Sequence, residues 1–451
     1  MGQSLAELSY SDAPKIVVKP PGPKATEIME KLLKYVPQHL YDLPSFPFTV
    51  WDSQRGATMR DVDGNIFIDF TGGMHTASTG YCHPKVVQAI AEITAKLAQA
   101  SSGQTAIRVE AARKLLKIIP SGMRNKCKTF FQSSGTEAVE AMTRIARFFT
   151  KKTNIISLHH HYYGRGQIAA TMTGPALACL FKGFGPYPSG ALHAPTPYCY
   201  RCSFGQIYPG CDLLCADYLQ EVIKTESAPD DVAGLILEPW ARWGGTPKGY
   251  LTRVKEICEE NEMLLLCDEI TCGFGRTGKW WACEWENVTP DIMTTAKGLT
   301  SGYGGSAVVA PNEMLEILPP GSQIQTYAMQ PLTCASVSAT IDVMKEMNIV
   351  QNAARVGDHI LKRLTEMKEE HELIGNVWGR GLHFGVDLVK NRKTKEPARE
   401  EGHQILVKAF EKGLNNFGVG WSTPPLILTR ELAEKALDIL EESIKEVETG
   451  L

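Results

Sequence analysis

The sequence predicts an α/β protein with two parts: a large domain built on a mainly parallel sheet, and a smaller α+β domain made from the N- and C-terminal segments. Two observations lead to this prediction. Between about residues 86 and 310, short apolar runs alternate with amphipathic helical patterns, which is typical of strand–helix–strand units. After residue 341 the pattern changes to long helices around one short strand region. We therefore expect a large domain over residues 61–340, and a small domain that combines residues 1–60 with residues 341–451.

The individual elements can be predicted in order along the chain. Residues 25–36 form an amphipathic stretch. In residues 59–70 the tight turn Asp63-Gly64-Asn65 lies between two short strands, which predicts a β-hairpin. In the C-terminal part we expect a strand region at 381–388 and helices at 400–414 and 430–447. The strands of the large sheet are expected at residues 129–132, 154–158, 232–237, 264–268, 292–295 and 306–309.

Composition narrows the function classes. A chain of 451 residues with 43% hydrophobic content can bury a large core. Its formal net charge of -3 comes from intermixed signs, so we expect neither a nucleic acid nor an anionic membrane as partner. There is no apolar run of membrane-spanning length and no signal-peptide pattern at the N-terminus, which predicts a cytoplasmic protein.

Two segments about thirty residues apart carry the first chemical signal. The run that ends at Asp268 predicts a buried strand closed by an acid, and the run that ends at Lys297 predicts a strand closed by a single lysine before a Gly-rich turn. A pyridoxal phosphate enzyme needs this pair of groups. The lysine amine holds the cofactor aldehyde as a Schiff base, and the acid keeps the ring nitrogen protonated so that the ring can accept electrons.

Such a cofactor also needs a phosphate cradle and partners for its ring. The turn Ser134-Gly135-Thr136 lies between a predicted strand and a predicted helix, where backbone N–H groups bind phosphate oxygens. Ser134 and Glu137 also match an ordinary capping box, and both interpretations can hold together. Tyr162, on the loop after strand 154–158, can stack on one face of the ring, and Ile270 can cover the other.

Ordered motifs over nearly the whole chain resemble the class III (ω-type, fold-type I) pyridoxal phosphate-dependent aminotransferases. They include the hairpin segment 61–70, the Ser-Gly-Thr-Glu-Ala run at 134–138, the segments at 162–165, 238–245, 268–278 and 297–298, and the closing Thr-Pro-Pro-Leu at 423–426. The resemblance implies a homodimer with shared active sites, with dimers or tetramers both open. It implies that Thr326 of the neighbouring subunit contacts the phosphate, and that Glu238 helps to position the cofactor.

The same resemblance implies that Lys297 is the catalytic residue, which moves the proton at the donor Cα. The substrates would be a small-molecule amine and a keto acid such as pyruvate. Relatives that grip an α-carboxylate usually carry an arginine at the position of Trp421, and an acid at the position of Trp243. These tryptophans favour an ω-amine or a β- or ω-amino acid as donor. We place the substrate pocket at these two tryptophans together with His75, Tyr163 and Arg242.

Two alternatives remain open. The same fold hosts amino acid racemases and epimerases, and the segments at 20–25 and 197–202 resemble members of that branch, although those enzymes carry an aspartate where Trp243 stands. A noncatalytic relative that binds a metal or a partner is the second alternative. Four thiols within seventeen positions could close a zinc site on a loop, or could simply be free thiols: Cys199, Cys202, Cys211 and Cys215.

Overall fold

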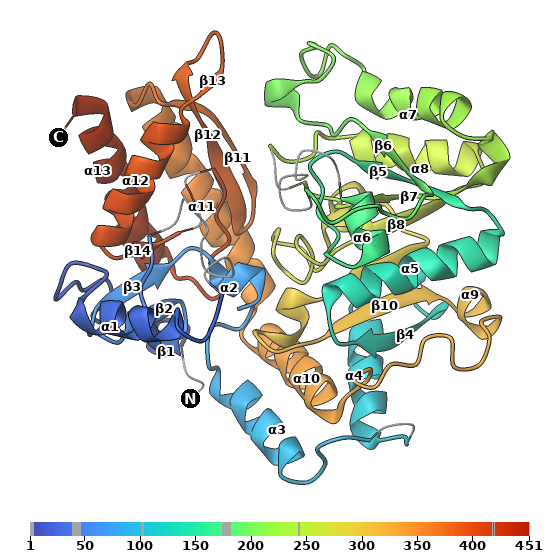
Figure 1. Ribbon diagram of the computed structural model, residues 1–451, viewed down its shortest axis with the longest axis horizontal. Coiled ribbons are helices and arrows are strands. Elements are labelled where there is room, and N and C mark those ends of the chain that lie inside the picture. Colours follow the sequence, from blue (N-terminus) through green and yellow to red (C-terminus); the bar gives the residue numbers. More distant parts are fainter. Residues whose placement is uncertain are drawn as a thin grey trace. The chain divides into compact units, whose positions relative to one another are not determined.

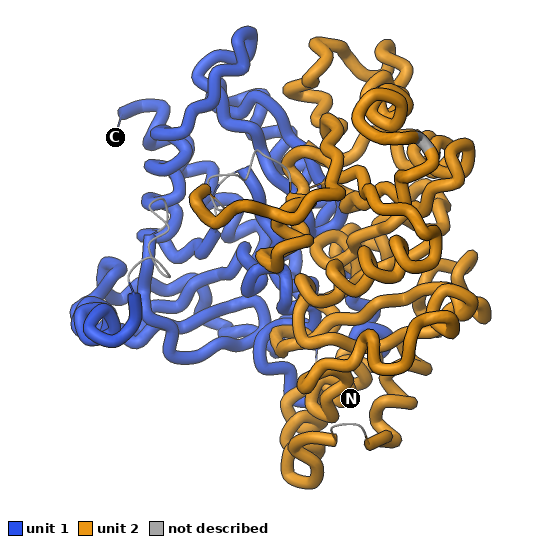
Figure 2. The backbone as a smooth tube through the Cα atoms, turned by 45° about the vertical axis from the view of Figure 1, so that its right-hand side comes forward, with its two compact units in different colours: residues 1–84, 344–451 blue, residues 85–343 orange. Residues whose placement is uncertain are grey.

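The computed structural model describes residues 4–37, 47–100, 103–173, 182–241, 244–416, 418 and 420–450. The chain divides into two compact units, one made of residues 1–84 and 344–451 and the other of residues 85–343 (Figure 2). The sequence placed the first boundary at residue 60. The hairpin between 58 and 69 belongs instead with the terminal segments, because its second strand pairs with a strand near residue 414.

The second unit is built around a seven-stranded sheet in the order β4-β10-β9-β8-β7-β5-β6 (Figure 1). Neighbouring strands from β9 to β6 run parallel, while β10 is antiparallel to both β4 and β9. The predicted α/β class with a mainly parallel sheet is therefore confirmed. The strands are β4 (Cys127–Gln132), β5 (Asn154–Leu158), β6 (Ala191–Ala194), β7 (Val232–Leu237), β8 (Leu264–Asp268), β9 (Ile292–Thr295) and β10 (Ser306–Pro311).

Helices cover this sheet, and its central strands β7, β8 and β9 are almost entirely buried. Every residue of β7 is buried, which is typical of a parallel strand covered on both faces. Helix α5 (Gly135–Thr150) packs on several strands, and α7 (Leu214–Thr225) packs beside α8 (Tyr250–Glu260) (Figure 1). The other helices of this unit are α3 (Pro84–Thr94), α4 (Ala106–Leu116), α6 (Gln167–Met172), α9 (Asn312–Glu316) and α10 (Pro331–Glu346), with short 3-10 turns that include η5 (Cys199–Arg201) and η8 (Lys297–Thr300).

The first unit contains two small sheets. Strands β1 (Trp51–Arg55), β2 (Thr58–Asp61) and β3 (Ile66–Asp69) form an antiparallel meander, and β14 (Leu414–Asn415) adds a parallel strand to β3. The predicted hairpin is present, with its turn at Gly64. The second sheet joins β11 (Ile374–Arg380), β12 (His383–Asn391) and β13 (Glu396–Pro397). The helices are α1 (Pro23–Leu32), α2 (Gly72–His75), α11 (Ile349–Glu370), α12 (Arg399–Glu411) and α13 (Arg430–Thr449).

Helix α2 contains a left-handed turn. Gly72, Gly73, Met74 and His75 all have φ between 54° and 69°. The left-handed region costs a non-glycine residue roughly 1–2 kcal/mol, so Met74 and His75 adopt it only because their surroundings hold them there. At Gly72 a side chain is excluded outright, since a Cβ would overlap the carbonyl oxygen of Thr423.

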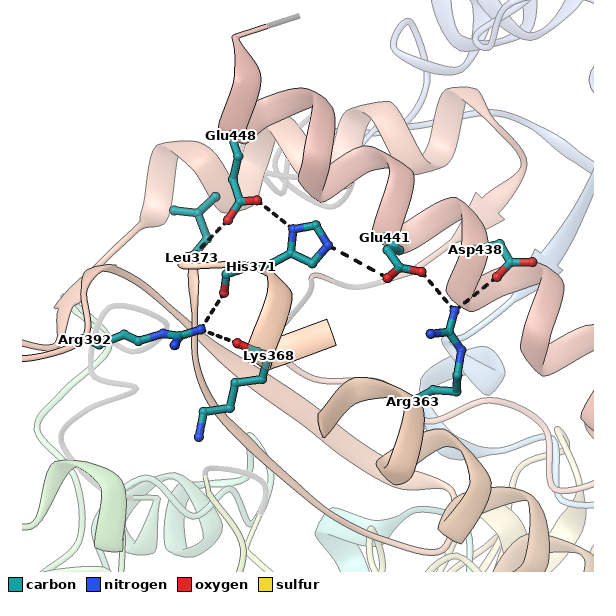
Figure 3. Close-up of polar contacts among 8 residues, drawn as sticks. All are labelled: Arg363, Lys368, His371, Leu373, Arg392, Asp438, Glu441 and Glu448. Atoms are coloured by element: carbon teal, nitrogen blue, oxygen red, sulfur yellow. Dashed lines mark hydrogen bonds and ion pairs between the residues drawn. The ribbon is translucent and has the colours of Figure 1, made fainter. Parts of the chain in front are cut away.

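Ion pairs join the end of α11 to α13 (Figure 3). His371, at the end of α11, lies 2.6 Å from Glu448 through Nδ1 and 3.9 Å from Glu441 through Nε2, and Arg363 pairs with Glu441 at 2.9 Å. Among the described residues, the donor atoms of Glu370, His371 and Glu441 lie within 4.8 Å of one another. Because Arg363 pairs with Glu441 and Glu448 contacts His371, we interpret this group as a contact that docks the C-terminal helix.

In the described part of the chain, we find no helix that combines the length and the apolar character needed to cross a bilayer.

Candidate active site

Most of the predicted cofactor residues gather at one edge of the large sheet. Strands β5, β7, β8 and β9 are parallel neighbours, so their carboxyl ends meet at the same edge, which is where α/β proteins bind ligands. Tyr162 follows β5, Glu238 follows β7, Asp268 is the last residue of β8, and Lys297 follows β9 after a single alanine. The spacing of apolar runs in the sequence thus placed four side chains from distant segments on one edge.

Asp268 is a buried acid with only 2% of its surface exposed. Its Oδ1 accepts hydrogen bonds from the backbone N–H of Ile270 at 2.9 Å and from the hydroxyl of Thr294 at 3.3 Å. Burial, and then the charge of Glu238, raise the pKa of Asp268 to about 7, against the lowering effect of these hydrogen bonds and of Lys297. A cationic partner beside this carboxylate would offset the cost of its burial.

Lys297 is the first residue of η8, and its Nζ donates a hydrogen bond to the Thr271 hydroxyl at 2.9 Å. Its φ of 44° lies in the left-handed region, which is uncommon for a residue with a side chain. Backbone strain of this kind costs of the order of 1–3 kcal/mol and clusters at functional sites. The lysine is therefore held in one orientation by its backbone and by Thr271.

The predicted phosphate turn has the expected form. Ser134 caps α5, its hydroxyl accepts a hydrogen bond from the N–H of Glu137 at 3.3 Å, and the Glu137 carboxylate accepts the N–H of Ser134 at 3.1 Å. A Cβ on Gly135 would lie 3.1 Å from the Ile270 Cδ1, so the backbone approaches Ile270 closely. Gly164, with φ of 128°, lies against Thr136, because a Cβ there would overlap the Thr136 hydroxyl.

A chain of hydrogen bonds connects the loops after β5 and β7. Glu238 accepts the backbone N–H of Tyr162 at 3.0 Å, while the Glu238 N–H donates to Nδ1 of His161 at 2.9 Å. Because Nδ1 is an acceptor, the proton of a neutral His161 sits on Nε2, which lies 3.3 Å from the Thr196 hydroxyl. These hydrogen bonds fix the backbone of Tyr162. The contact between a backbone N–H and the His161 ring is not visible in the spacing of residues along the sequence.

These residues fit pyridoxal phosphate. Both hydrogen bonds of Asp268 go to Oδ1, which leaves its geometry suited to a ring nitrogen at Oδ2. The glycine at 135 lets backbone N–H groups of the α5 start reach a phosphate, and the helix dipole favours that anion. The amine of Lys297 would be available to the cofactor aldehyde.

The predicted substrate residues are placed differently from one another. Tyr163 lies in the hydrophobic core with 2% of its surface exposed, and its hydroxyl donates a hydrogen bond to the Ile236 carbonyl at 3.0 Å. Its contacts therefore stabilise the core and do not line a substrate pocket. Thr326 is exposed, and its carbonyl accepts a hydrogen bond from Gln99. Arg242 and Trp243 lie outside the described residues.

His75 and Trp421 come together within the first unit. Their ring centroids are 4.4 Å apart, and the Trp421 Nε1 donates to Nε2 of His383 at 3.0 Å. Trp378 packs edge-on against His383, with a centroid distance of 5.8 Å. The sequence singled out His75 and Trp421 but missed His383, which the register of β12 brings beside them.

Two other residues of the site were not predicted. The hydrogen bond between Thr271 and Lys297 is not visible in the sequence. Glu269 is fully buried and accepts the backbone N–H groups of Ala282 at 2.9 Å and Cys283 at 2.8 Å. It thereby anchors the loop that follows Asp268. In the sequence, the signal for Glu269 is that it directly follows Asp268, the acid predicted to contact the cofactor.

The fold and the site together define a fold-type I pyridoxal phosphate enzyme. The class-III aminotransferase family model matches residues 44–444. The chain is 37% identical, over 98% of its length and 95% of the relative's, to an alanine/serine racemase from Pyrococcus horikoshii. It is 32% identical to a probable 4-aminobutyrate aminotransferase from Bacillus subtilis, which covers 87% of this chain and 92% of the relative.

A solved S-selective transaminase from Bacillus megaterium superposes with a TM-score of 0.84 at 28% identity, covering 94% of this chain and 98% of that one. The chain therefore belongs to the class III aminotransferase family. It is an enzyme, and its cofactor is pyridoxal 5'-phosphate.

Proposed function

We propose that this enzyme moves an amino group from an ω-amine, or from a β- or ω-amino acid, to a keto acid such as pyruvate. The observation that carries the proposal is the pairing of Lys297, held 2.9 Å from the Thr271 hydroxyl, with the buried Asp268 on the neighbouring strand end. Pyridoxal phosphate, when bound, supplies an aldehyde that takes up the amino group and a ring that accepts the electron pair from Cα.

The residues of the chain then have separate tasks. With pyridoxal phosphate bound, the Lys297 amine would take the proton from the donor Cα and deliver it to the carbon on the cofactor side, because it is the basic group that the site holds in a fixed position. Asp268 would keep the proton on the ring nitrogen, and the start of α5 would bind the phosphate. Thr271 orients the lysine amine between these proton transfers.

The proposed donor class rests on the residue at position 421. Gripping an α-carboxylate requires the planar fork of an arginine, and Trp421 offers one N–H, which it donates to His383. Trp421 also stacks near His75, so its environment is aromatic. A donor without a carboxylate, or with its carboxylate distant from the amine, does not need an arginine at position 421.

Racemisation is a second candidate, because the chain shares 37% identity over 98% of its length with a protein named an alanine/serine racemase. A racemase needs a proton donor on each face of Cα. Lys297 serves one face, and at position 243 this chain has tryptophan where racemases of this fold carry an aspartate. The sequence at that position therefore favours transfer over racemisation.

One experiment separates the two candidates. Purified holoenzyme is mixed in D2O with β-alanine, 4-aminobutyrate, taurine, 1-phenylethylamine or L-alanine, with and without pyruvate, and the Lys297→Ala variant serves as control. Amino transfer predicts loss of the lysine-bound cofactor absorbance with an ω-donor, and alanine formation only when pyruvate is present. Appearance of deuterated D-alanine from L-alanine without any keto acid would instead establish racemisation and overturn the proposal.

We also propose a homodimer in which Thr326 reaches the phosphate of the other copy. Its exposed position on the turn after α9 supports this arrangement. Mixing Lys297→Ala chains with Thr326→Ala chains tests it: a heterodimer would contain one site with both residues intact, so activity would rise above that of either variant alone. If the mixture shows only the average of the two activities, Thr326 acts within its own chain or not at all.

A further inference from the structure

Four cysteines outside the cofactor site surround one small cavity. Cys199 and Cys202 lie at the start and just after the end of η5, Cys211 lies in the following turn, and Cys215 lies in the first turn of α7. All four line a cavity of about 20 Å³. That is room for about one water-sized particle. None of the four is in a disulfide, and each is partly buried.

The chemistry of this cavity is uniform. Apart from the thiols, its described lining is apolar or uncharged, including the rings of Phe204 and Tyr208, and it holds no Asp, Glu, His, Lys or Arg side chain. Thiolates are soft ligands that select zinc-class ions over the hard cations that carboxylates bind.

We propose that Cys199, Cys202, Cys211 and Cys215 bind one thiophilic divalent cation of the zinc class. The two pairs are separated by two and three residues, both within the spacing of structural zinc sites. No three of the four sulfurs lie within 4.8 Å of one another in the structure. A tetrahedral ion with bonds of about 2.3 Å requires sulfurs about 3.8 Å apart, so binding draws the thiols inward around the cavity.

The ligands lie on segments that can make this movement. They come from a single 3-10 turn, an irregular turn and the first turn of a helix, so none of the four is fixed in a strand or in the interior of a long helix. Each thiol that binds gives its proton to the solvent, and four thiolates around a divalent cation leave a net charge of about -2 at the site. No electron transfer is involved.

A cation here would stabilise the surroundings of the cofactor site. The cavity is also lined by Thr196, whose hydroxyl lies 3.3 Å from Nε2 of His161, the residue that accepts the N–H of Glu238. On the other side, Tyr208 donates a hydrogen bond to the Lys248 carbonyl at 3.1 Å, on the loop after β7. The cation would thus tie the loop after β6 to the loops after β5 and β7. Its role is structural.

The test uses purified holoenzyme. Metal content is measured by mass spectrometry after dialysis, and Co²⁺ is then exchanged into the protein and followed by its absorbance. The expected result is about one metal per chain and the intense sulfur-to-cobalt bands of a tetrahedral thiolate site. Cys199→Ser and Cys215→Ser should each lower bound metal at least tenfold, while Cys82→Ser, which changes an exposed cysteine of the other unit, should leave it unchanged.

A second measurement does not depend on the variants folding. Wild-type enzyme is stripped with a chelator, and Ellman's reagent counts its accessible thiols before and after Zn²⁺ is added back. Protection of about four thiols by one equivalent of Zn²⁺ supports the site. Overturning results are the absence of protection, disulfides among these cysteines, zinc that leaves on dialysis alone, or metal retained in both serine variants. The cofactor absorbance, recorded in parallel, reports the fate of the proposed transferase activity separately.

Discussion

The Asp268→Asn variant tests whether the buried carboxylate of Asp268 destabilises the folded protein when no cofactor is bound. The pKa of Asp268 rises from its ordinary 3.8 to about 7 in the folded chain, chiefly through burial. Because the folded state holds the proton more tightly than the unfolded chain, stability falls as pH rises from about 4 to about 7 and stays at its lower level above that. At about 1.4 kcal/mol per pH unit, the penalty reaches roughly 4 kcal/mol at pH 8.

Asparagine removes the charge and keeps the local contacts. Both hydrogen bonds to Asp268 are accepted by Oδ1, and an amide oxygen can accept them equally well. The apo form of the variant should therefore be more stable than the wild-type apoenzyme by roughly 2 kcal/mol at pH 5 and roughly 4 kcal/mol at pH 8. For a unit of this size these gains correspond to melting temperatures higher by about 4 °C and about 8 °C, respectively.

The assay is thermal unfolding of both apoenzymes between pH 5 and pH 8, after cofactor removal with phenylhydrazine and dialysis. Asp230→Asn, which changes an exposed acid of the same unit, is the matched control. Added pyridoxal phosphate should then stabilise the wild type more than Asp268→Asn. A difference in melting temperature that stays constant with pH, or shrinks as pH rises, would refute the reasoning.

Three further predictions follow from the site. Thr271→Val removes the acceptor of the Lys297 hydrogen bond and should lower kcat about tenfold, with Thr271→Ser close to wild type; equal rates would show that Thr271 does not orient the lysine. Gly164→Ala places a Cβ on the Thr136 hydroxyl at a left-handed φ, and should weaken pyridoxal phosphate binding at least tenfold in a fluorescence titration, whereas unchanged affinity would separate Thr136 from the phosphate site. Ser134→Ala breaks the capping box and should cost about 1 kcal/mol, seen as a melting temperature lower by about 2 °C; a neutral change would mean that the Glu137 carboxylate alone caps α5.

Patterns of apolar residues were sufficient to locate most of the large sheet. The predicted bounds of β5, β7, β8 and β9 agree with the structure residue for residue, and nearly all residues of these strands are buried. Strand β6 escaped prediction because its four residues, Ala-Leu-His-Ala, are short and only partly buried, and therefore carry no periodic signal. Its position at the edge of the sheet explains this weak apolar character.

In the candidate site, the residues that could be predicted from the sequence are those whose chemistry points to a single role. Lysine at the end of β9 and aspartate at the end of β8 point to a cofactor through their chemistry. The contacts that orient them were not predictable, because they depend on register and rotamers: Thr271 on Lys297, His161 on Glu238, and His383 on Trp421. Tyr163 shows the reverse case, since an aromatic residue on a promising loop turns inward to the core.

The pairing of β3 with β14 has a consequence for synthesis of the chain. Ile68 pairs with Leu414, and the residues between them contain the whole of the second unit. A ribosome that adds 5–20 residues per second needs roughly 20–70 s to make that stretch. During this time the edge of β3 is unpaired, and its residues Ile66, Phe67 and Ile68, which are fully buried in the folded protein, lack part of their cover. The nascent hairpin is thus the segment that we expect chaperones to hold, while the cofactor-binding unit, which is continuous in sequence, folds first.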